Sequence, residues 1–297
     1  MADKTKPIAW QGSMPELQGA WFGQETPGLE PVEFRPEILS AERSGAHVAG
    51  ISFGPVGNEA FFTLNTTVGS ADLMWMRMID GIWLKPQLAP FNSLQIDNDI
   101  CLSPDGQRLC WRSWRPLPGS AIAAERASLW TVDREGDTWS EPVPITCDGE
   151  IQSGWYPGIA RSGTLYFSAE ESPNEYTVYR ANREGSQYGP RVPIIRGLKS
   201  GGDLCVAPDE SFVVITCFSL PQFKGVGDLH VSFQPSPGKW TSLRNLGSAI
   251  NTELLEYCPT ISADGRWLFF CRLDRATRQG SAFWVDASII DSLRPSP

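Results

Sequence analysis

A unit of about 50 residues recurs from residue 47 to the C-terminus, and this repeat constrains the fold more than any other sequence feature. Each copy has a tight-turn signature between two short apolar runs. The clearest are Ser103-Pro104-Asp105-Gly106 and Ser262-Ala263-Asp264-Gly265, and weaker copies contain Gly57, Gly163 and Glu210. Pro presets φ, Asp hydrogen-bonds its own backbone and Gly tolerates positive φ. Each signature therefore predicts a β-hairpin.

Two further strands follow the hairpin in each copy. The third is a short apolar run such as Leu129-Trp130-Thr131-Val132. The fourth is predicted where an aromatic residue is followed closely by Pro or Leu, as at Trp83 and Trp139. Four antiparallel strands repeated around a ring form the blades of a β-propeller. The sequence predicts an all-β fold, a β-propeller of about five four-stranded blades.

The sequence predicts one domain, residues 21–290, with an N-terminal tail (1–20) before it and a C-terminal tail (291–297) after it. We expect the blades near residues 47–96, 97–153, 154–200, 201–255 and 256–290. The last copy lacks its outer strand. We expect the N-terminal segment 28–40, around Val32-Glu33, to supply that strand, because pairing the two chain ends closes the ring and removes free edges.

Charge and composition exclude some functions. The net charge is −9, so the basic face of a nucleic-acid binder is not expected, and nucleic acid and anionic membranes are not predicted partners. No apolar run suggests a secretory signal or a transmembrane helix, which favours the cytoplasm. The seven cysteines have no short metal-ligand spacing and fit reduced thiols in that compartment.

The repeat resembles the TolB-like (WD-like) β-propeller repeat family over about residues 47–290. The two clear turn signatures carry the resemblance, together with Ala207-Pro208-Asp209-Glu210-Ser211. The stretch from Trp21 to Gly28 also resembles the opening of a bacterial single-domain subgroup of such propellers. The resemblance implies the propeller fold. It implies no single function, because such propellers include protein-binding modules and enzymes.

Four carboxylates are predicted to meet at one mouth of the propeller channel, because the first strand of each blade borders that channel. Alignment on the turns matches Glu256 with Asp97, and matches Cys258 with Asp99, Tyr156, Asp203 and Gly50. Crowded carboxylates favour acid–base catalysis, a divalent cation such as calcium held by Asp97, Asp99, Asp203 and Glu256, or a cationic ligand. Alternatively, each acid fastens the blades by capping a backbone N–H or by pairing with Arg112, Arg115 or Arg272.

Aromatic residues near the same mouth are candidate ligand walls. Trp155 and Tyr156 begin the third blade, where they either stack on a ligand or fill space beside small residues. Arg112 and Trp114 precede an insertion that runs to about Arg126, and loops on rigid scaffolds often carry function. His47 begins the first blade and is either a proton carrier or a solvated histidine.

These observations predict a small ligand, sugar-like or natural-product-like, bound at the channel mouth. Hydrolase, lyase or isomerase chemistry by carboxylates is the catalytic form of this hypothesis. The alternative is a non-catalytic propeller that binds a protein or peptide. The sequence contains no P-loop or Rossmann fingerprint. The two hypotheses differ in whether the main concavity is a polar mouth or an exposed apolar patch.

Overall fold

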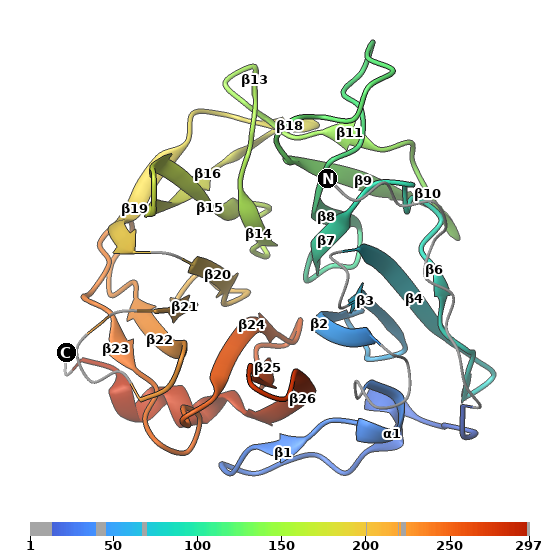
Figure 1. Cartoon of the computed structure of the whole chain (residues 1–297), viewed down its shortest axis with the longest axis vertical. Coiled ribbons are helices and arrows are strands. Elements are labelled where there is room, and N and C mark those ends of the chain that lie inside the picture. Colours follow the sequence, from blue (N-terminus) through green and yellow to red (C-terminus); the bar gives the residue numbers. More distant parts are fainter. Residues whose placement is uncertain are drawn as a thin grey trace.

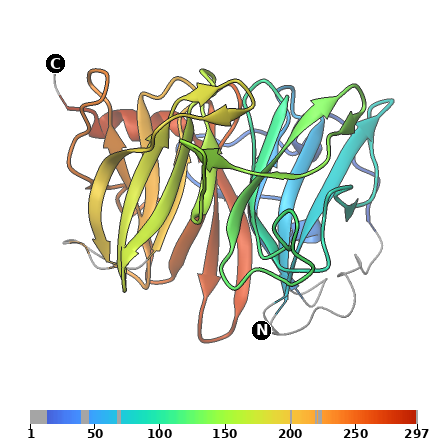
Figure 2. The same ribbon diagram turned by 90° about the horizontal axis from the view of Figure 1, so that it is seen from above.

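The computed structural model describes residues 14–39, 46–66, 70–199, 201–218, 220 and 224–295. Residues 1–13 of the predicted N-terminal tail and the last two residues of the C-terminal tail lie outside these ranges. The described chain is all-β and its sheets surround a common axis in a propeller-like arrangement (Figure 1). The strands run between the two faces of the ring (Figure 2). None of the helices in the described ranges is long and apolar enough to cross a membrane.

Five sheets each begin with a strand at the axis. The first contains β2 (Ala46–Phe53), β3 (Glu59–Thr66), β4 (Ala71–Ile79), β5 (Ile82–Trp83) and β6 (Gln87–Leu88). The second contains β7 (Asp97–Leu102), β8 (Arg108–Ser113), β9 (Ser128–Glu135), β10 (Thr138–Trp139) and β11 (Val143–Pro144). The third contains β14 (Trp155–Ile159), β15 (Leu165–Ser172), β16 (Glu175–Ala181) and β19 (Val192–Lys199).

The remaining two axial sheets complete the ring. The fourth contains β20 (Gly201–Val206), β21 (Phe212–Cys217), β22 (Asp228–Phe233) and β23 (Arg244–Asn245). The fifth contains β24 (Leu255–Ile261), β25 (Trp267–Asp274), β26 (Gln279–Asp286) and β1 (Val32–Glu33). Each inner strand contacts the next in the order β2, β7, β14, β20 and β24, and β24 contacts β2.

The predicted turn signatures are confirmed, because each joins the first two strands of an axial sheet. In the second sheet the Gly106 N–H donates to the Ser103 carbonyl at 2.8 Å. Gly106 has φ 72°, a left-handed conformation that glycine adopts without strain. The Asp105 carboxylate accepts from the Gln107 N–H at 3.0 Å. The local chemistry that predicted the hairpins is the chemistry that forms them.

The described residues contain six sheets, one more than the five predicted. The sixth consists of two-residue strands at the rim of the ring: β12 (Thr146–Cys147), β13 (Glu150–Ile151), β17 (Arg183–Glu184) and β18 (Gln187–Tyr188). Cys147 pairs with Tyr188 in parallel, which joins segments that belong to two different repeats. The repeat pattern compares each copy with the next and cannot reveal such a pairing.

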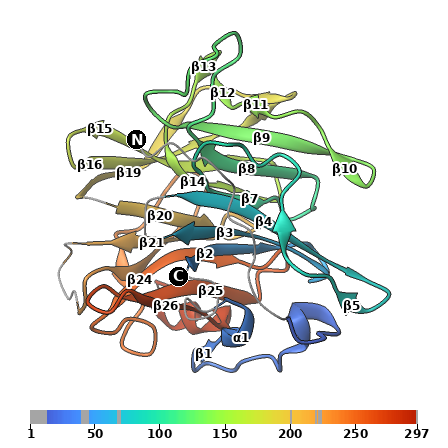
Figure 3. The same ribbon diagram turned by 45° about the vertical axis from the view of Figure 1, so that its right-hand side comes forward.

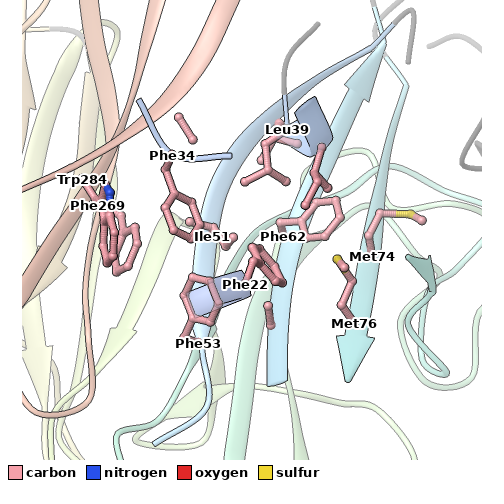
Figure 4. Packing of buried hydrophobic residues seen from close by; sticks show 14 of the residues in the cluster. Phe22, Phe34, Leu39, Ile51, Phe53, Phe62, Met74, Met76, Phe269 and Trp284 are labelled. Carbon is pink, nitrogen blue, oxygen red and sulfur yellow. The ribbon is translucent and has the colours of Figure 1, made fainter. Parts of the chain in front are cut away.

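The N-terminal segment closes the ring, as predicted. Val32 pairs with Trp284 on β26, and the Phe34 N–H donates to the Ala282 carbonyl at 2.7 Å. Figure 3 shows β1 and the short helix α1 (Pro36–Leu39) beside β26. The Phe34 ring centroid lies 4.9 Å from that of Trp284 and 5.7 Å from that of Phe53 (Figure 4). Phe34 therefore joins the first sheet to the fifth.

Two 3₁₀ helices flank the ring: η1 (Ala20–Gly23) and η2 (Ala287–Leu293). In η1, Trp21 and Phe22 have positive φ values of 54° and 55°. The Phe22 side chain is fully buried and packs edge-on against Trp83 at 4.4 Å between centroids. The segment from Trp21 to Gly28, whose sequence resembles the start of other propellers, thus contributes Phe22 to the hydrophobic core.

Candidate functional site

Each inner strand has an irregular register near its start. The shifts lie between Ala49 and Ile51, Asn98 and Cys101, Trp155 and Gly158, Gly201 and Leu204, and Tyr257 and Thr260. A β-bulge at such a place re-aims a side chain. The residues within four of the shifts have positive φ: Gly50 (68°), Asp99 (59°), Tyr156 (49°) and Cys258 (49°).

Four of the five inner-strand residues that the sequence alignment matched, Gly50, Asp99, Tyr156 and Cys258, are therefore the positive-φ residues of their shifts. In β20 the positive φ belongs to Gly202 (125°), and Asp203 follows it. Gly50, Asp99, Tyr156 and Cys258 line a narrow cavity on the axis, with a volume of about 50 Å³. We call it the axial cavity. It has room for a few waters but not for a sugar-sized ligand, because ligand pockets measure roughly 300–1,000 Å³.

Asp99 and Asp203 each accept a backbone hydrogen bond from the next inner strand. The Tyr156 N–H donates to Asp99 Oδ2 at 3.4 Å, and the Cys258 N–H donates to Asp203 Oδ2 at 3.1 Å. The Tyr156 hydroxyl accepts a hydrogen bond from Cys258 Sγ at 3.6 Å, and it lowers the pKa of the Asp203 carboxyl group. The bulges thus place two carboxylates and one phenol at the start of the axial cavity.

Burial controls the protonation of these two acids. Desolvation raises the pKa of Asp99 to about 6, although Arg112 and the Tyr156 N–H act in the opposite direction. Desolvation likewise raises the pKa of Asp203 to about 7, and the charge of Asp99 raises it further. Within the described part of the chain, neither acid forms an ion pair with lysine or arginine. Both carboxyl groups can therefore exchange a proton near neutral pH.

The prediction that Asp97 joins this group is wrong. Asp97 is fully buried, and its carboxylate accepts from Arg115 at 3.2 Å, from the Trp111 indole at 3.2 Å and from the Ser93 N–H at 2.6 Å. Its lone pairs are used by neighbours inside the second sheet. Asp97 fastens the blade, which is the alternative that the sequence left open.

Glu256 is corrected in the same way. It is fully buried and faces Arg272, its register partner on β25, with Oε1 2.8 Å from Arg272 Nε. Its carboxylate also accepts from the Thr252 hydroxyl at 2.6 Å and the Thr252 N–H at 3.0 Å. Among the described residues no three His, Cys, Asp or Glu side chains are grouped to hold a metal ion. The predicted four-carboxylate calcium site is therefore not assembled.

His47 lies at the beginning of β2, opposite Asn65 on β3. Its side chain is half-buried, and burial lowers its pKa. Within the described residues its imidazole makes no hydrogen bond to Asp99 or Asp203. The structure therefore does not link His47 to the acids at the axis.

A second cavity opens beside the axis, where β8 ends and β14 begins. It has a volume of about 740 Å³ and is lined by Arg112, Trp114 and Trp155, together with the insertion after β8 and the β12–β13 turn. We call it the mouth pocket. Three of the four predicted ligand-wall residues meet there. The fourth, Tyr156, lines the axial cavity instead, because the bulge turns it away from Trp155.

The Arg112 guanidinium lies between two indole rings. Its central carbon is 4.1 Å from the ring centroid of Trp114 and 4.6 Å from that of Trp155. Trp155 in turn packs edge-on against Tyr176 at 5.4 Å. Burial lowers the pKa of Arg112, although the charge of Asp99 acts in the opposite direction. Arg112 thus lines the mouth pocket and also interacts electrostatically with Asp99 at the axial cavity.

Sequence reasoning missed other residues of the mouth pocket. Arg126 lines it, and the predicted end of the insertion was a signal for this residue. Asp148 lies in the β12–β13 turn, Glu150 begins β13, and Glu170 lies on β15. All three are outside the aligned inner-strand positions. The sixth sheet brings Asp148 and Glu150 to the pocket, and the third sheet brings Glu170.

No protein-family model and no curated protein sequence matches the chain. Solved structures match it in fold. A putative TolB from Agrobacterium tumefaciens has 12% identity and a TM-score of 0.55, covering 85% of this chain and 79% of its own. The chain is similar in fold to TolB-like propellers. The resemblance predicted from the repeats is confirmed at that level.

Two further structures show the range of proteins with this fold. An α-L-arabinofuranosidase from Lactobacillus brevis has 9% identity and a TM-score of 0.56, covering 82% of this chain and 90% of its own. A protein of unknown function from Dyadobacter fermentans has 14% identity and a TM-score of 0.52, covering 89% and 84%. At these identities the likeness shows the fold alone.

Proposed function

We propose that this protein binds a small molecule in the mouth pocket and that Asp99 and Asp203, at the neighbouring axial cavity, exchange protons with the ligand through water held in that cavity. The observation that carries the proposal is the guanidinium of Arg112 packed against Trp114 and Trp155 in a cavity of about 740 Å³. Aromatic walls with a few placed polar groups are typical of ligand sites. In this proposal the five sheets at the axis are the blades, and the β12–β13 part of the sixth sheet forms one wall of the pocket.

Size favours the mouth pocket over the axial cavity as the ligand site. The axial cavity, at about 50 Å³, admits only a few waters, whereas the mouth pocket has the volume of ordinary ligand sites. A sugar-like or natural-product-like ligand fits the mixture of indoles and charged groups. A propeller of similar fold is an α-L-arabinofuranosidase, which is consistent with a sugar-like ligand.

The catalytic part of the proposal rests on the two unpaired acids. Asp99 lies behind Arg112, and its pKa is raised to about 6. Asp203, with a pKa raised to about 7, shares the Tyr156 hydroxyl and the electrostatic field of Asp99. General acid–base catalysis is most efficient when the pKa lies near the working pH. Hydrolase, lyase or isomerase chemistry is the reaction class that such a pair supports.

A screen of small molecules by thermal shift tests the binding proposal. Wild type is compared with Trp114→Leu and Trp155→Leu, and the matched control is Trp240→Leu, because Trp240 lines a separate cavity of about 770 Å³. A compound that stabilises wild type and the control, but neither pocket variant, supports the proposal. Compounds that stabilise all four proteins equally would contradict it. An absence of stabilising compounds would favour the protein- or peptide-binding alternative.

Activity is tested on any compound that binds. If the protein converts it, Asp99→Asn should abolish turnover and leave binding within about threefold, because a residue that acts only in the transition state changes kcat rather than affinity. Turnover that survives in both Asp99→Asn and Asp203→Asn would exclude the acid–base role.

A further inference from the structure

We infer that the ligand of the mouth pocket carries one acidic group, a carboxylate or a phosphate ester, and that Arg112 binds this group. The inference rests on the proposed function, because it takes the mouth pocket as the ligand site. It adds the chemical class of the ligand and the residue that selects it. The argument comes from the hydrogen-bonding state of Arg112.

The Arg112 guanidinium contacts two indole rings, but its donors have no acceptor within the described chain. Its central carbon lies 4.1 Å from the ring centroid of Trp114 and 4.6 Å from that of Trp155. Nε is buried and has no hydrogen-bond partner, and none of the described residues accepts a hydrogen bond from the Arg112 side chain. A guanidinium has five N–H donors in one plane. The indoles thus hold the cation without accepting these hydrogen bonds, which leaves the donors for an acceptor from outside the chain.

Other arginines of this protein show that the fold normally supplies such an acceptor. Arg108 binds both carboxylate oxygens of Asp133, at 2.6 and 2.7 Å. Arg115, three residues beyond Arg112, binds Asp97 and the Phe91 carbonyl. Arg272 binds Glu256. Each of these guanidinium groups is paired with a carboxylate of its own chain, and Arg112 is not.

Asp99 does not fill this role. Its charge is close enough to raise the pKa of Arg112, but the two side chains form no ion pair. The bulge in β7 gives Asp99 a positive φ of 59° and directs its Oδ2 to the Tyr156 N–H. The arginine is therefore desolvated without a full partner, which is costly for stability and is characteristic of a residue retained for binding.

Carboxylate and phosphate oxygens match the geometry of a guanidinium edge, because two parallel N–H donors reach two oxygens of one group. The rest of the pocket limits how much negative charge the ligand carries. Glu125, Asp148, Glu150 and Glu170 line the same pocket and would repel a polyanion. The ligand that fits has a single acidic group at Arg112 and a neutral or basic remainder toward the acidic side chains.

Paired probes test this inference on the full chain. Benzoate is compared with benzamide, and phenyl phosphate with phenol, by titration calorimetry and tryptophan fluorescence. We expect each acidic probe to bind at least about tenfold more tightly than its neutral partner, since one charge-assisted hydrogen bond is worth that factor or more. Arg112→Gln should remove this preference, and Arg112→Lys should reduce it, because a lysine keeps the charge but loses the planar donor pair.

Arg77 provides the matched control. Its guanidinium carbon lies 4.2 Å from the Trp75 ring centroid, and its Nε is also buried without a partner, but it does not line the mouth pocket. Arg77→Gln should leave the affinity for benzoate unchanged. If Arg112→Gln fails to fold, Arg112→Lys decides the question, and a benzoate affinity equal to wild type would overturn the inference.

The outcomes separate this inference from the proposed function. Equal binding of acidic and neutral probes, lost in Trp114→Leu and Trp155→Leu, would overturn the acidic-ligand inference and keep the mouth pocket as a ligand site. If the acidic probes bind both tryptophan variants as tightly as wild type, the anion site lies outside the mouth pocket. This result would contradict both the acidic-ligand inference and the proposed function. No binding of either acidic probe below about 10 mM would also overturn the inference, because even a weak specific contact reaches millimolar affinity.

Discussion

Asp97 and Glu256 differ from Asp99 and Asp203 in what the fold places opposite them, although all four lie near the starts of inner strands. The first two are held by Arg115 and Arg272 inside their own sheets. The other two sit at the bulges that line or adjoin the axial cavity, where their partners are backbone N–H groups and the Tyr156 hydroxyl. Similar positions in the repeat thus give different electrostatic environments.

Unfavourable electrostatic free energy in this protein is concentrated at buried charges that lack a counter-ion. A buried carboxylate that faces an arginine has its charge compensated, whereas desolvation without a counter-ion favours the protonated form. Three groups lack such compensation: Asp99 and Asp203 interact with each other at the axis, and Arg112 interacts with Asp99 from the mouth pocket. Such gathering of perturbed groups is typical of functional sites. The paired acids hold the blades, and the unpaired groups are available for chemistry.

The largest expected effect is that of Glu256→Gln. Removing one partner of a buried ion pair leaves Arg272 uncompensated, so the free energy of unfolding should fall by about 3–5 kcal/mol. Urea denaturation at pH 7 measures it. The control is Glu175→Gln, which breaks an exposed pair with Lys199 at 3.4 Å and should leave the free energy of unfolding nearly unchanged, because water screens an exposed pair. Equal losses of unfolding free energy in Glu256→Gln and Glu175→Gln would show that the buried ion pair stabilises the fold no more than an exposed pair does.

Asp203→Asn should act in the opposite direction. The folded-state pKa of Asp203, about 7, lies above the ordinary value of 3.8. The folded protein therefore holds a proton that the unfolded chain releases, and this stabilisation, complete below pH about 4, is lost as the pH rises through about 7. The variant lacks this dependence. It should match wild type near pH 4 and exceed it by about 4 kcal/mol at pH 8, and a variant less stable at every pH would make Asp203 a fastener.

The smallest effect is expected for Tyr156→Phe. The Tyr156 hydroxyl lowers the pKa of Asp203, against the larger effect of burial. Its removal should raise the pKa of Asp203 further and cost about 1 kcal/mol, the net value of one hydrogen bond. The pH dependence of unfolding would then shift to higher pH. A variant with an unshifted profile would show that the hydroxyl does not reach Asp203 in solution.

The sequence was sufficient for the features that recur within each repeat. The turn signatures identified the inner hairpins, and alignment on them matched Asp99, Tyr156 and Cys258, which the structure places at equivalent bulges. The sequence could not decide whether Asp97 and Glu256 join the carboxylate cluster or pair with arginines inside the blades, because that depends on where two arginine side chains point. Arg115 follows its strand and Arg272 lies across the hairpin, so both were candidates and only the packing shows that they pair.

Features that join different repeats were beyond the sequence pattern. The sixth sheet depends on the pairing of Cys147 with Tyr188, which are far apart in the chain and belong to different copies. The mouth pocket depends on the same rim, because the β12–β13 turn and the insertion after β8 enclose it. Arg112, Trp114 and Trp155 were named from their position near the mouth, but the stacking that leaves the Arg112 edge without an acceptor follows from tertiary packing.

The most direct test of the division between the two kinds of carboxylate is a carbon-13 NMR titration of the aspartate side-chain carboxyl groups, with Asp99→Asn and Asp203→Asn used to assign the signals. The account predicts midpoints near pH 6 for Asp99 and near pH 7 for Asp203. Midpoints for both near the ordinary value of 3.8 would contradict it. The two acids would then be ordinary ionised groups at neutral pH, and the case for acid–base chemistry at the axis would fail.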